Sequence, residues 1–240
     1  MRFGLLLASA AILAACNISA NAQRNDSAAG VATQRSFEVG AFDAVSLEGP
    51  HNLIVKVGGA PSVRAEGSAE VLDHLEVLVE NGSLVVRQER GQWNWGHRKP
   101  ATVYVTVPAL TAASIGGSGN ISIDKVTGDS FKAALGGSGN IDIGALSVGK
   151  ADFSIAGSGN IKAAGKADTT STSIAGSGDV AIDGLESQTA SISIVGSGNA
   201  NVRASGTAAV TIMGSGDVTV AGGGKCTVNK MGSGDVRCGG

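Results

Sequence analysis

Hydrophobic and polar residues alternate with a period of two through the second half of the chain, and one short turn interrupts this alternation at regular intervals. Gly-Ser-Gly followed by Asn or Asp occurs seven times, at intervals of 18–20 residues. Apolar side chains stand two positions before the first glycine and four and six positions after it, and the positions between them are small and polar. This pattern predicts strands, because alternate side chains of a strand point to opposite faces. The copies begin at Gly117, Gly137, Gly157, Gly176, Gly196, Gly214 and Gly232.

A second glycine-bearing corner lies between most consecutive copies, so each repeat is predicted to run strand, corner, strand, corner. One such unit cannot bury its apolar face, but stacked copies bury a continuous core. Parallel crossovers are right-handed in nearly all proteins. We therefore predict an all-β fold, a single-stranded right-handed parallel β-helix with 18–20-residue coils. A coil this narrow has room for columns of Ile and Val and little room for aromatic rings.

The residue after each Gly-Ser-Gly is Asn in four copies and Asp in the other three, at Asp179, Asp217 and Asp235. Asn and Asp tolerate positive φ, and stacked Asn side chains form hydrogen-bonded ladders. Stacked carboxylates repel one another unless they are hydrated. We therefore expect a ladder at this corner, on the solvent edge of the fold.

A degenerate copy of the turn precedes the regular ones. Gly49-Pro50-His51-Asn52 aligns with Gly-Ser-Gly-Asn, and apolar residues occupy the expected positions on both sides of it. Further on, alternation in residues 75–88 is centred on Asn81-Gly82, a strong hairpin signal. We predict that residues 36–110 form the first coils with a hairpin excursion, continuous with the regular repeats of residues 111–238.

The N-terminal residues 1–15 resemble a signal peptide. Phe3 to Ala15 carries no charge and is too short to span a bilayer. The run ends in Leu13-Ala14-Ala15-Cys16, which resembles a bacterial lipobox, so Cys16 is the predicted site of lipidation and of attachment to the membrane. Asn17 follows it, where Asp is the inner-membrane retention signal, and this favours the outer membrane, facing the periplasm or the cell surface.

Two features complete the interpretation of the N-terminal region. Ala20-Asn21-Ala22 offers an alternative cleavage site before Gln23, which would give a soluble periplasmic or secreted protein. Residues 16–35 are polar and are expected to form a flexible tether.

Composition narrows the functional classes. The net charge is −2 without a basic excess, which argues against nucleic acid as a partner. The 37 glycines and 8 aromatic residues fit many tight corners around a core of small side chains. His51, His74 and His97 stand in unrelated contexts and are expected to lie on the surface or in loops.

The sequence contains no arrangement of residues typical of a catalytic site. Gly-Ser-Gly places its second glycine one residue too early for a nucleophile elbow, and the acids are spread singly rather than clustered in pairs. We predict no catalytic residue, cofactor or metal site, and leave calcium open only at Asp217 and Asp235.

Cys226 and Cys238 are left as a pair once Cys16 is lipidated, in an oxidising compartment. By position in the repeat both point into the last coil, so we favour a disulfide that clamps this coil, with two buried thiols as the alternative. Lys230 interrupts an otherwise apolar column in the same coil.

One loop between two predicted strands stands apart from the repeats. It contains both tryptophans of the chain, Trp93 and Trp95, followed by His97 and Arg98. Tryptophans two residues apart share a face and can contact a sugar or a partner protein. The alternative, which we favour, is that the indoles cap the end of the solenoid.

The repeated Gly-Ser-Gly-Asn-Ile turns, together with Phe42-Asp43-Ala44-Val45-Ser46-Leu47, Leu84-Val85-Val86 and Val105-Thr106-Val107-Pro108-Ala109-Leu110, resemble the bacterial family described as putative auto-transporter adhesin, head GIN domain. The resemblance covers about residues 36–238. It implies an exported right-handed β-helix and has no established activity attached to it.

These observations favour a non-enzymatic cell-envelope lipoprotein whose β-helix serves in adhesion or interaction, with a cell-surface glycan or an envelope protein as partner. Flat faces lined by Ser and Thr suit repeated weak contacts. The alternative is a periplasmic β-helix protein that binds or acts on polysaccharide, for which an acidic cleft across several coils would be the evidence.

Overall fold

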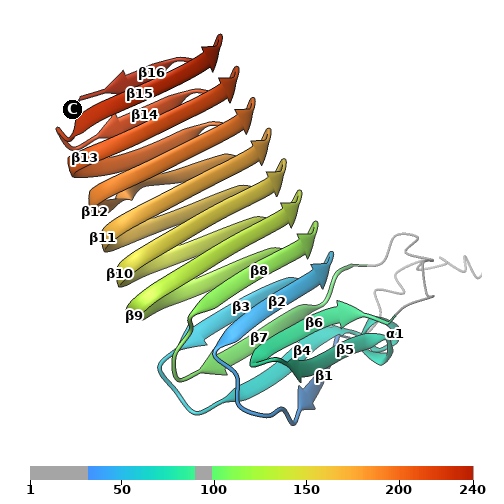
Figure 1. The fold of residues 1–240 in the computed structure, drawn as a ribbon. Coiled ribbons are helices and arrows are strands. Elements are labelled where there is room, and N and C mark those ends of the chain that lie inside the picture. The colour runs from blue at the N-terminus through green and yellow to red at the C-terminus, as the bar shows by residue number, and fades with distance from the viewer. Residues whose placement is uncertain (1–31, 90–98, 240) are drawn as a thin grey trace, which may run out of the picture. The chain divides into compact units, whose positions relative to one another are not determined.

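The computed structural model describes residues 32–89 and 99–239, and these form a flattened β-solenoid (Figure 1). One short helix, α1 (Ala69–Asp73), accompanies the strands in this part of the chain. The strands are β1 (Ala32–Phe37), β2 (Ala44–Gly49), β3 (Asn52–Val57), β4 (Ser62–Ser68), β5 (Leu75–Glu80), β6 (Ser83–Gln88), β7 (Thr102–Val107), β8 (Ala112–Gly117), β9 (Asn120–Gly137), β10 (Asn140–Gly157), β11 (Asn160–Gly176), β12 (Asp179–Gly196), β13 (Ala200–Gly214), β14 (Val218–Ala221), β15 (Lys225–Gly232) and β16 (Val236–Cys238).

The long strands β9 to β13 each trace one coil of the solenoid. A coil leaves the Gly-Ser-Gly turn, which we call the glycine corner, along one face, bends at an opposite second corner and returns along the other face (Figure 1). Successive coils pair in parallel, and equivalent repeat positions lie side by side, as in Ile141 with Ile161 and Gly157 with Gly176. The predicted parallel β-helix and its coil length are confirmed.

The glycine corner is constant, whereas the second corner absorbs the differences in coil length. Pairing of β10 with β11 shifts register between Ile143 and Leu146, and pairing of β12 with β13 shifts after Ile182 and again after Ser187. Register is continuous from there to the next Gly-Ser-Gly. Coils of different length therefore keep their glycine corners aligned and differ in shape at the second corner.

The core consists of the predicted apolar columns, with two aromatic rings that the prediction did not place there. Phe131 and Phe153 are both 1% exposed. They fit because each faces a small residue in the neighbouring coil: Phe131 is paired with Ala151, and Phe153 with Ala133. The expectation of little room for rings was wrong, because a small residue in one coil makes room for a large one in the next.

The N-terminal region confirms the degenerate copy and the hairpin. Gly49 pairs with Gly117, and Asn52 pairs with Asn120, as the alignment with Gly-Ser-Gly-Asn requires. Strands β5 and β6 are antiparallel around Asn81 and Gly82, whose φ angles are 50° and 79°. Two consecutive residues with positive φ are typical of the type I′ hairpin turn.

The coils at this end do not stack in chain order. Strand β2 lies between β6 and β8, and β3 lies between β7 and β9. The coil made of β6 and β7 is therefore farther from the regular repeats than the earlier coil made of β2 and β3. After β7 the chain returns past the coil of β2 and β3 and begins β8 on its other side (Figure 1).

The ordered domain begins before the predicted boundary at residue 36. Residues 32–35, assigned to the tether, belong to β1, which is antiparallel to β4 at the edge of the sheet. The Arg35 guanidinium donates hydrogen bonds to the Leu72 carbonyl at 2.6 Å and to the Asp73 carboxylate at 2.5 Å. These contacts depend on α1, a helix that the alternating pattern did not reveal.

The predicted ladder at the glycine corner is present in two forms. Asn120 donates to Asn52, Asn140 to Asn120 and Asn160 to Asn140, with Nδ2 to Oδ1 distances of 2.7–3.0 Å. From Asp179 onward, each side-chain oxygen accepts the backbone N–H of the next Asn or Asp, at 2.8–3.0 Å. A carboxylate cannot donate, so the backbone amide supplies the proton that the ladder needs.

Positive φ, by contrast, occurs at another residue of the corner. The first glycine of every Gly-Ser-Gly has a φ of +127° to +148°, and Asn81 is the only non-glycine with positive φ among the described residues. The expectation that Asn and Asp stand here because they tolerate positive φ was therefore wrong. The hydrogen bonds of the ladder explain why these residues follow each Gly-Ser-Gly.

Close contact between coils explains the second glycine of the corner. A Cβ atom on Gly159 would lie 2.1 Å from the Gly139 carbonyl oxygen and 2.7 Å from the Leu135 side chain. No φ constraint operates there, so the space between coils alone requires glycine.

One coil of the core is polar. Thr170 and Thr172 of β11 are 4% and 2% exposed, at positions that hold apolar residues in the adjacent coils. The Thr170 hydroxyl lies 3.4 Å from the Ser187 hydroxyl, whereas the Thr172 hydroxyl oxygen is buried without a hydrogen-bond partner.

Replacing Thr172 by Val should stabilise the protein by about 1 kcal/mol, because it removes an unsatisfied buried hydroxyl without changing the side-chain volume much. The matched change Thr170→Val removes a hydroxyl that has a partner and should not stabilise. Urea unfolding midpoints measure both; a Thr172→Val midpoint at or below that of the unmodified protein would contradict this reading.

The last coil is closed by three side chains. A disulfide joins Cys226 and Cys238, with Cα atoms 6.4 Å apart, in the range that disulfides span. Cys226 pairs with Ala208, and Cys238 pairs with Val220. Lys230 reaches along this coil, and its Nζ donates to the Gly234 carbonyl at 2.7 Å.

We expect Cys226 and Cys238 to be oxidised in the protein isolated from an oxidising compartment. Alkylation without reductant should leave the intact mass of this pair unchanged. A Cys238→Ser variant should lose about 2 kcal/mol, because the bridge closes a short loop in the unfolded chain. Two alkylated thiols at these positions would contradict the prediction.

Candidate functional site

The predicted lipidation site and the predicted ligand-contact residues lie outside the described part of the chain. These are Cys16 and the set Trp93, Trp95, His97 and Arg98. The latter four belong to the connection between β6 and β7. Their expected roles remain predictions.

His51 is not a surface histidine, and that expectation was wrong. Its side chain is fully buried at the degenerate corner between β2 and β3. The Ala101 backbone N–H donates to Nδ1 at 3.2 Å, so Nε2 carries the proton and donates to the Gln88 side-chain oxygen at 3.0 Å. Burial lowers the pKa of His51 below its ordinary value of 6.5, and the Gln88 hydrogen bond opposes this.

The position of His51 gives it a structural role. It takes the place of the second glycine of the corner, and the ring extends to the outer coil formed by β6 and β7. Ala101, which donates to the ring, also accepts the Asn52 backbone N–H at 3.0 Å. His51 thus holds the two coils together at a corner where no Gly-Ser-Gly exists. His74 is different: it is partly exposed and lies 3.1 Å from the Glu89 carboxylate.

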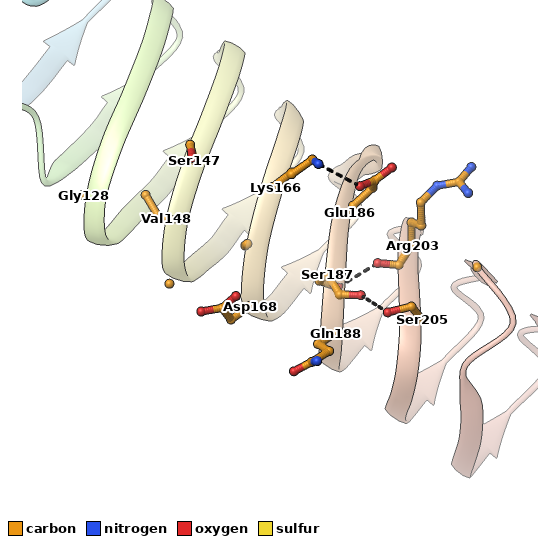
Figure 2. A pocket seen from close by; sticks show the side chains of 13 residues that line it. Gly128, Ser147, Val148, Lys166, Asp168, Glu186, Ser187, Gln188, Arg203 and Ser205 are labelled. Atoms are coloured by element: carbon orange, nitrogen blue, oxygen red, sulfur yellow. Dashed lines mark hydrogen bonds and ion pairs between the residues drawn. The ribbon is translucent and has the colours of Figure 1, made fainter.

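A groove of about 620 Å³ runs along the second corner of the solenoid (Figure 2). It crosses strands β9 to β13 and reaches Gly222 beyond β14, so one continuous site is built from several coils. The groove lies where the register shifts occur, since coils of unequal length bend differently there. We call it the second-corner groove.

Three columns of residues form the second-corner groove. Each column takes one residue from each successive coil, about 4.8 Å apart along the solenoid axis. Along the floor Val148, Ala167 and Ser187 are buried and Gly128 is exposed, and the wall residues are exposed except Gly149, which is half-buried. One wall is Ser147, Lys166, Glu186 and Arg203; the floor is Gly128, Val148, Ala167 and Ser187; the other wall is Gly149, Asp168, Gln188 and Ser205.

Hydrogen bonds fix the floor of the groove. Ser187 is 5% exposed, and its hydroxyl donates to the Arg203 carbonyl at 2.7 Å. The Ser205 hydroxyl donates to the Ser187 carbonyl at 3.2 Å (Figure 2). These two hydrogen bonds join β12 and β13 at the floor of the groove.

Charges of both signs line the walls. Lys166 Nζ lies 3.8 Å from a Glu186 carboxylate oxygen, and Arg203 Nε donates to the Asp183 carbonyl at 3.0 Å. Figure 2 shows Asp168 and Glu186 on opposite sides of the groove, pointing away from one another. They do not form the facing carboxylate pair that glycoside hydrolysis uses.

The outer surface between the second corner and the glycine corner presents a field of hydroxyls on β11, β12 and β13. Nine stacked positions contain eight Ser or Thr residues and no charge, and all but Ser171 are exposed. The positions are Thr169, Ser171, Ser173, Thr189, Ser191, Ser193, Thr207, Ala209 and Thr211. This is the flat Ser- and Thr-lined face that the repeat predicts.

The His, Cys, Asp and Glu side chains of residues 32–89 and 99–239 are dispersed over the fold. No group of three His, Cys, Asp or Glu side chains gathers there. Asp217 accepts the Asp235 backbone N–H at 2.8 Å, which gives it a role in the ladder. No helix in the described part has the length and apolar character needed to cross a membrane.

Sequence reasoning missed the second-corner groove, although a signal for it exists. Lys166, Glu186 and Arg203 are long charged side chains at one repeat position in three consecutive coils. The alignment of repeats on Gly-Ser-Gly hides this, because the coils differ in length before the second corner.

Comparison with known proteins identifies a family and solved structures that are similar to this chain. The family model described as putative auto-transporter adhesin, head GIN domain, matches residues 41–224. No curated protein matches the chain.

Several solved structures have the same fold. A putative adhesin from Bacteroides fragilis superposes with a TM-score of 0.81 at 21% identity, covering 86% of this chain and 96% of that one. A protein from Parabacteroides distasonis, described as a putative lipid binding protein, gives 0.70 at 21% identity, with coverage of 86% and 96%. A putative adhesin from Parabacteroides merdae gives 0.70 at 19%, with coverage of 86% and 95%. On the family match, the chain belongs to the putative auto-transporter adhesin, head GIN domain family.

Proposed function

We propose that this protein is an exported, non-catalytic adhesion module that holds an extended polymer of the cell envelope along its side. The observation that carries the proposal is the second-corner groove, which continues across five coils and repeats its wall positions from coil to coil. A site of this form can contact many units of one polymer, the mode of binding that solenoids favour. The flat hydroxyl field on the neighbouring face adds a second, uncharged surface.

A binding role fits the groove better than a catalytic one. General acid–base cleavage of a glycosidic bond needs two carboxyl groups on either side of it at a fixed separation. Here Glu186 is engaged with Lys166, and Asp168 points away from it (Figure 2). We propose that bound polymer is held and released intact.

The described fold neighbours carry both adhesin and lipid-binding descriptions. An acyl chain requires an apolar tunnel or cleft. The groove walls instead bear Lys166, Asp168, Glu186 and Arg203, which favours a hydrophilic ligand.

Attachment to the membrane through Cys16 completes the proposed role. The lipobox Leu13-Ala14-Ala15-Cys16 supports an outer-membrane lipoprotein, with cleavage before Gln23 as the alternative. Metabolic labelling with an alkyne fatty acid should label the protein and not a Cys16→Ala variant. Label that persists in the variant would contradict lipidation at Cys16.

The binding role is tested with three matched tryptophan substitutions of exposed serines. Ser147→Trp fills the second-corner groove, Ser173→Trp disturbs the hydroxyl field, and Ser138→Trp changes the opposite glycine corner. Each full-length variant is incubated with purified sacculi and with outer-membrane polysaccharide, and bound protein and released reducing ends are measured.

We expect Ser147→Trp to lose most of the bound protein, Ser138→Trp to bind normally, and no variant to release reducing ends. Equal binding by Ser147→Trp and Ser138→Trp would exclude the groove as the site. Release of reducing ends that disappears in Asp168→Asn would establish an enzyme instead.

A further inference from the structure

The charge pattern and orientation of the second-corner groove restrict the class of polymer that it can hold. We propose that the groove binds a single strand of a neutral glycan, aligned with the solenoid axis. This inference rests on the proposed function, because it names the ligand class of the same site.

The orientation of the groove argues against a peptide. Extended peptides are usually bound by adding a strand to a free sheet edge, where backbone hydrogen bonds supply the affinity. The second-corner groove crosses the strands instead of following an edge, and the coils that line it are paired with one another on both sides. A ligand in the groove therefore meets side chains, about 4.8 Å apart along its length.

The balance of charge argues against a polyelectrolyte. Lys166 and Arg203 contribute two positive charges to the lining, and Asp168 and Glu186 contribute two negative ones. Polyanion sites gather Lys and Arg and release counterions on binding. A polyanion in this groove would meet two carboxylates, and a polycation would meet Lys166 and Arg203.

The remaining groups suit hydroxyl-bearing units. The Asp168 carboxylate accepts hydrogen bonds, the Gln188 amide both donates and accepts, and the hydroxyls of Ser147 and Ser205 do the same. Val148 and Ala167, which are 8% and 7% exposed, make the part of the floor between these polar groups apolar. The groove volume of about 620 Å³ lies within the range of sites for small ligands, so it accommodates a short stretch of a longer strand.

The test is calorimetric titration of the full chain with soluble cellohexaose, chitohexaose and mannohexaose, beside two charged probes, an alginate hexamer and inorganic polyphosphate. We expect at least one neutral hexasaccharide to bind with one-to-one stoichiometry. Its Kd should change by less than about twofold between low and high salt, because a neutral ligand has no charge for the salt to screen.

Two substitutions place the ligand in the groove. Asp168→Ala should weaken binding about tenfold, since it removes a charged acceptor, while Asp142→Ala, an exposed aspartate away from the groove, should leave it unchanged. Glu186→Gln frees Lys166 from its partner, so it should strengthen binding of an anionic ligand but change the affinity for a neutral one by less than about threefold.

Preferential, salt-sensitive binding of alginate or polyphosphate would overturn the inference, as would neutral-glycan binding that survives Asp168→Ala. Absence of binding by every neutral hexasaccharide would also overturn it. In that case the polymer-capture experiment with Ser147→Trp still decides the proposed function on its own, because it measures binding to whole sacculi and to outer-membrane polysaccharide and does not use the neutral hexasaccharides.

Discussion

Gly159→Ala is expected to destabilise the solenoid by about 4 kcal/mol, among the larger effects of single substitutions. The new methyl group would lie 2.1 Å from the Gly139 carbonyl oxygen and within 3 Å of both Leu135 methyl groups. Because the nearest atom belongs to the backbone, two coils must separate at the corner. Their separation also breaks the ladder between Asn140 and Asn160.

Gly136→Ala is the matched control for that substitution. Its Cβ would point outward, 3.5 Å from the Ile115 carbonyl, and alanine already occupies the equivalent position at Ala156. We expect a change within about 0.5 kcal/mol in urea unfolding. If Gly159→Ala and Gly136→Ala lost similar amounts of stability, the steric explanation would be wrong, because only at Gly159 would the added methyl group clash with the backbone of a neighbouring coil.

The second large effect is expected at His51. His51→Ala should cost about 3 kcal/mol, because it empties a buried site and leaves the Ala101 N–H without its acceptor. His74→Ala, at a partly exposed histidine paired with Glu89, should cost less than about 1 kcal/mol. Urea unfolding at pH 7.5 provides both values.

The same histidine should make stability depend on pH. Burial lowers the pKa of His51 in the folded protein, so the unfolded chain takes up the proton first as the pH falls through 6.5. The unfolded state then binds more protons than the folded state, and stability declines with falling pH. Between pH 7.5 and 5.5 the decline should be steeper in the unmodified protein and in His74→Ala than in His51→Ala. A decline of equal steepness in all three would rule out His51 as its source.

The sequence predicts the regular part of this fold well, for a physical reason. Each repeat contains its own corner and its own apolar columns, so Ile141 and Ile161 reveal their pairing without knowledge of the rest of the chain. The degenerate corner at Asn52 and the hairpin at Asn81 could be predicted for the same reason, because each is defined by residues close to it in the sequence.

The features that escaped prediction depend on relations between coils. Burial of His51 requires the coil of β6 and β7 to pass outside that of β2 and β3, an order that no local pattern encodes. The second-corner groove arises from register shifts between coils of unequal length, at Ile143 and Ile182 among others. The walls Lys166, Glu186 and Arg203 become neighbours only after those shifts.

The edge position of β1 determines how the domain carries mechanical load. A pull on the chain ahead of Ala32 passes first to the six residue pairs between β1 and β4, and to the contacts of Arg35 with α1. The glycine corners and the second-corner groove lie beyond this connection. Detachment of β1 from β4 would therefore lengthen the free chain ahead of β2 while every coil of the solenoid remains in place.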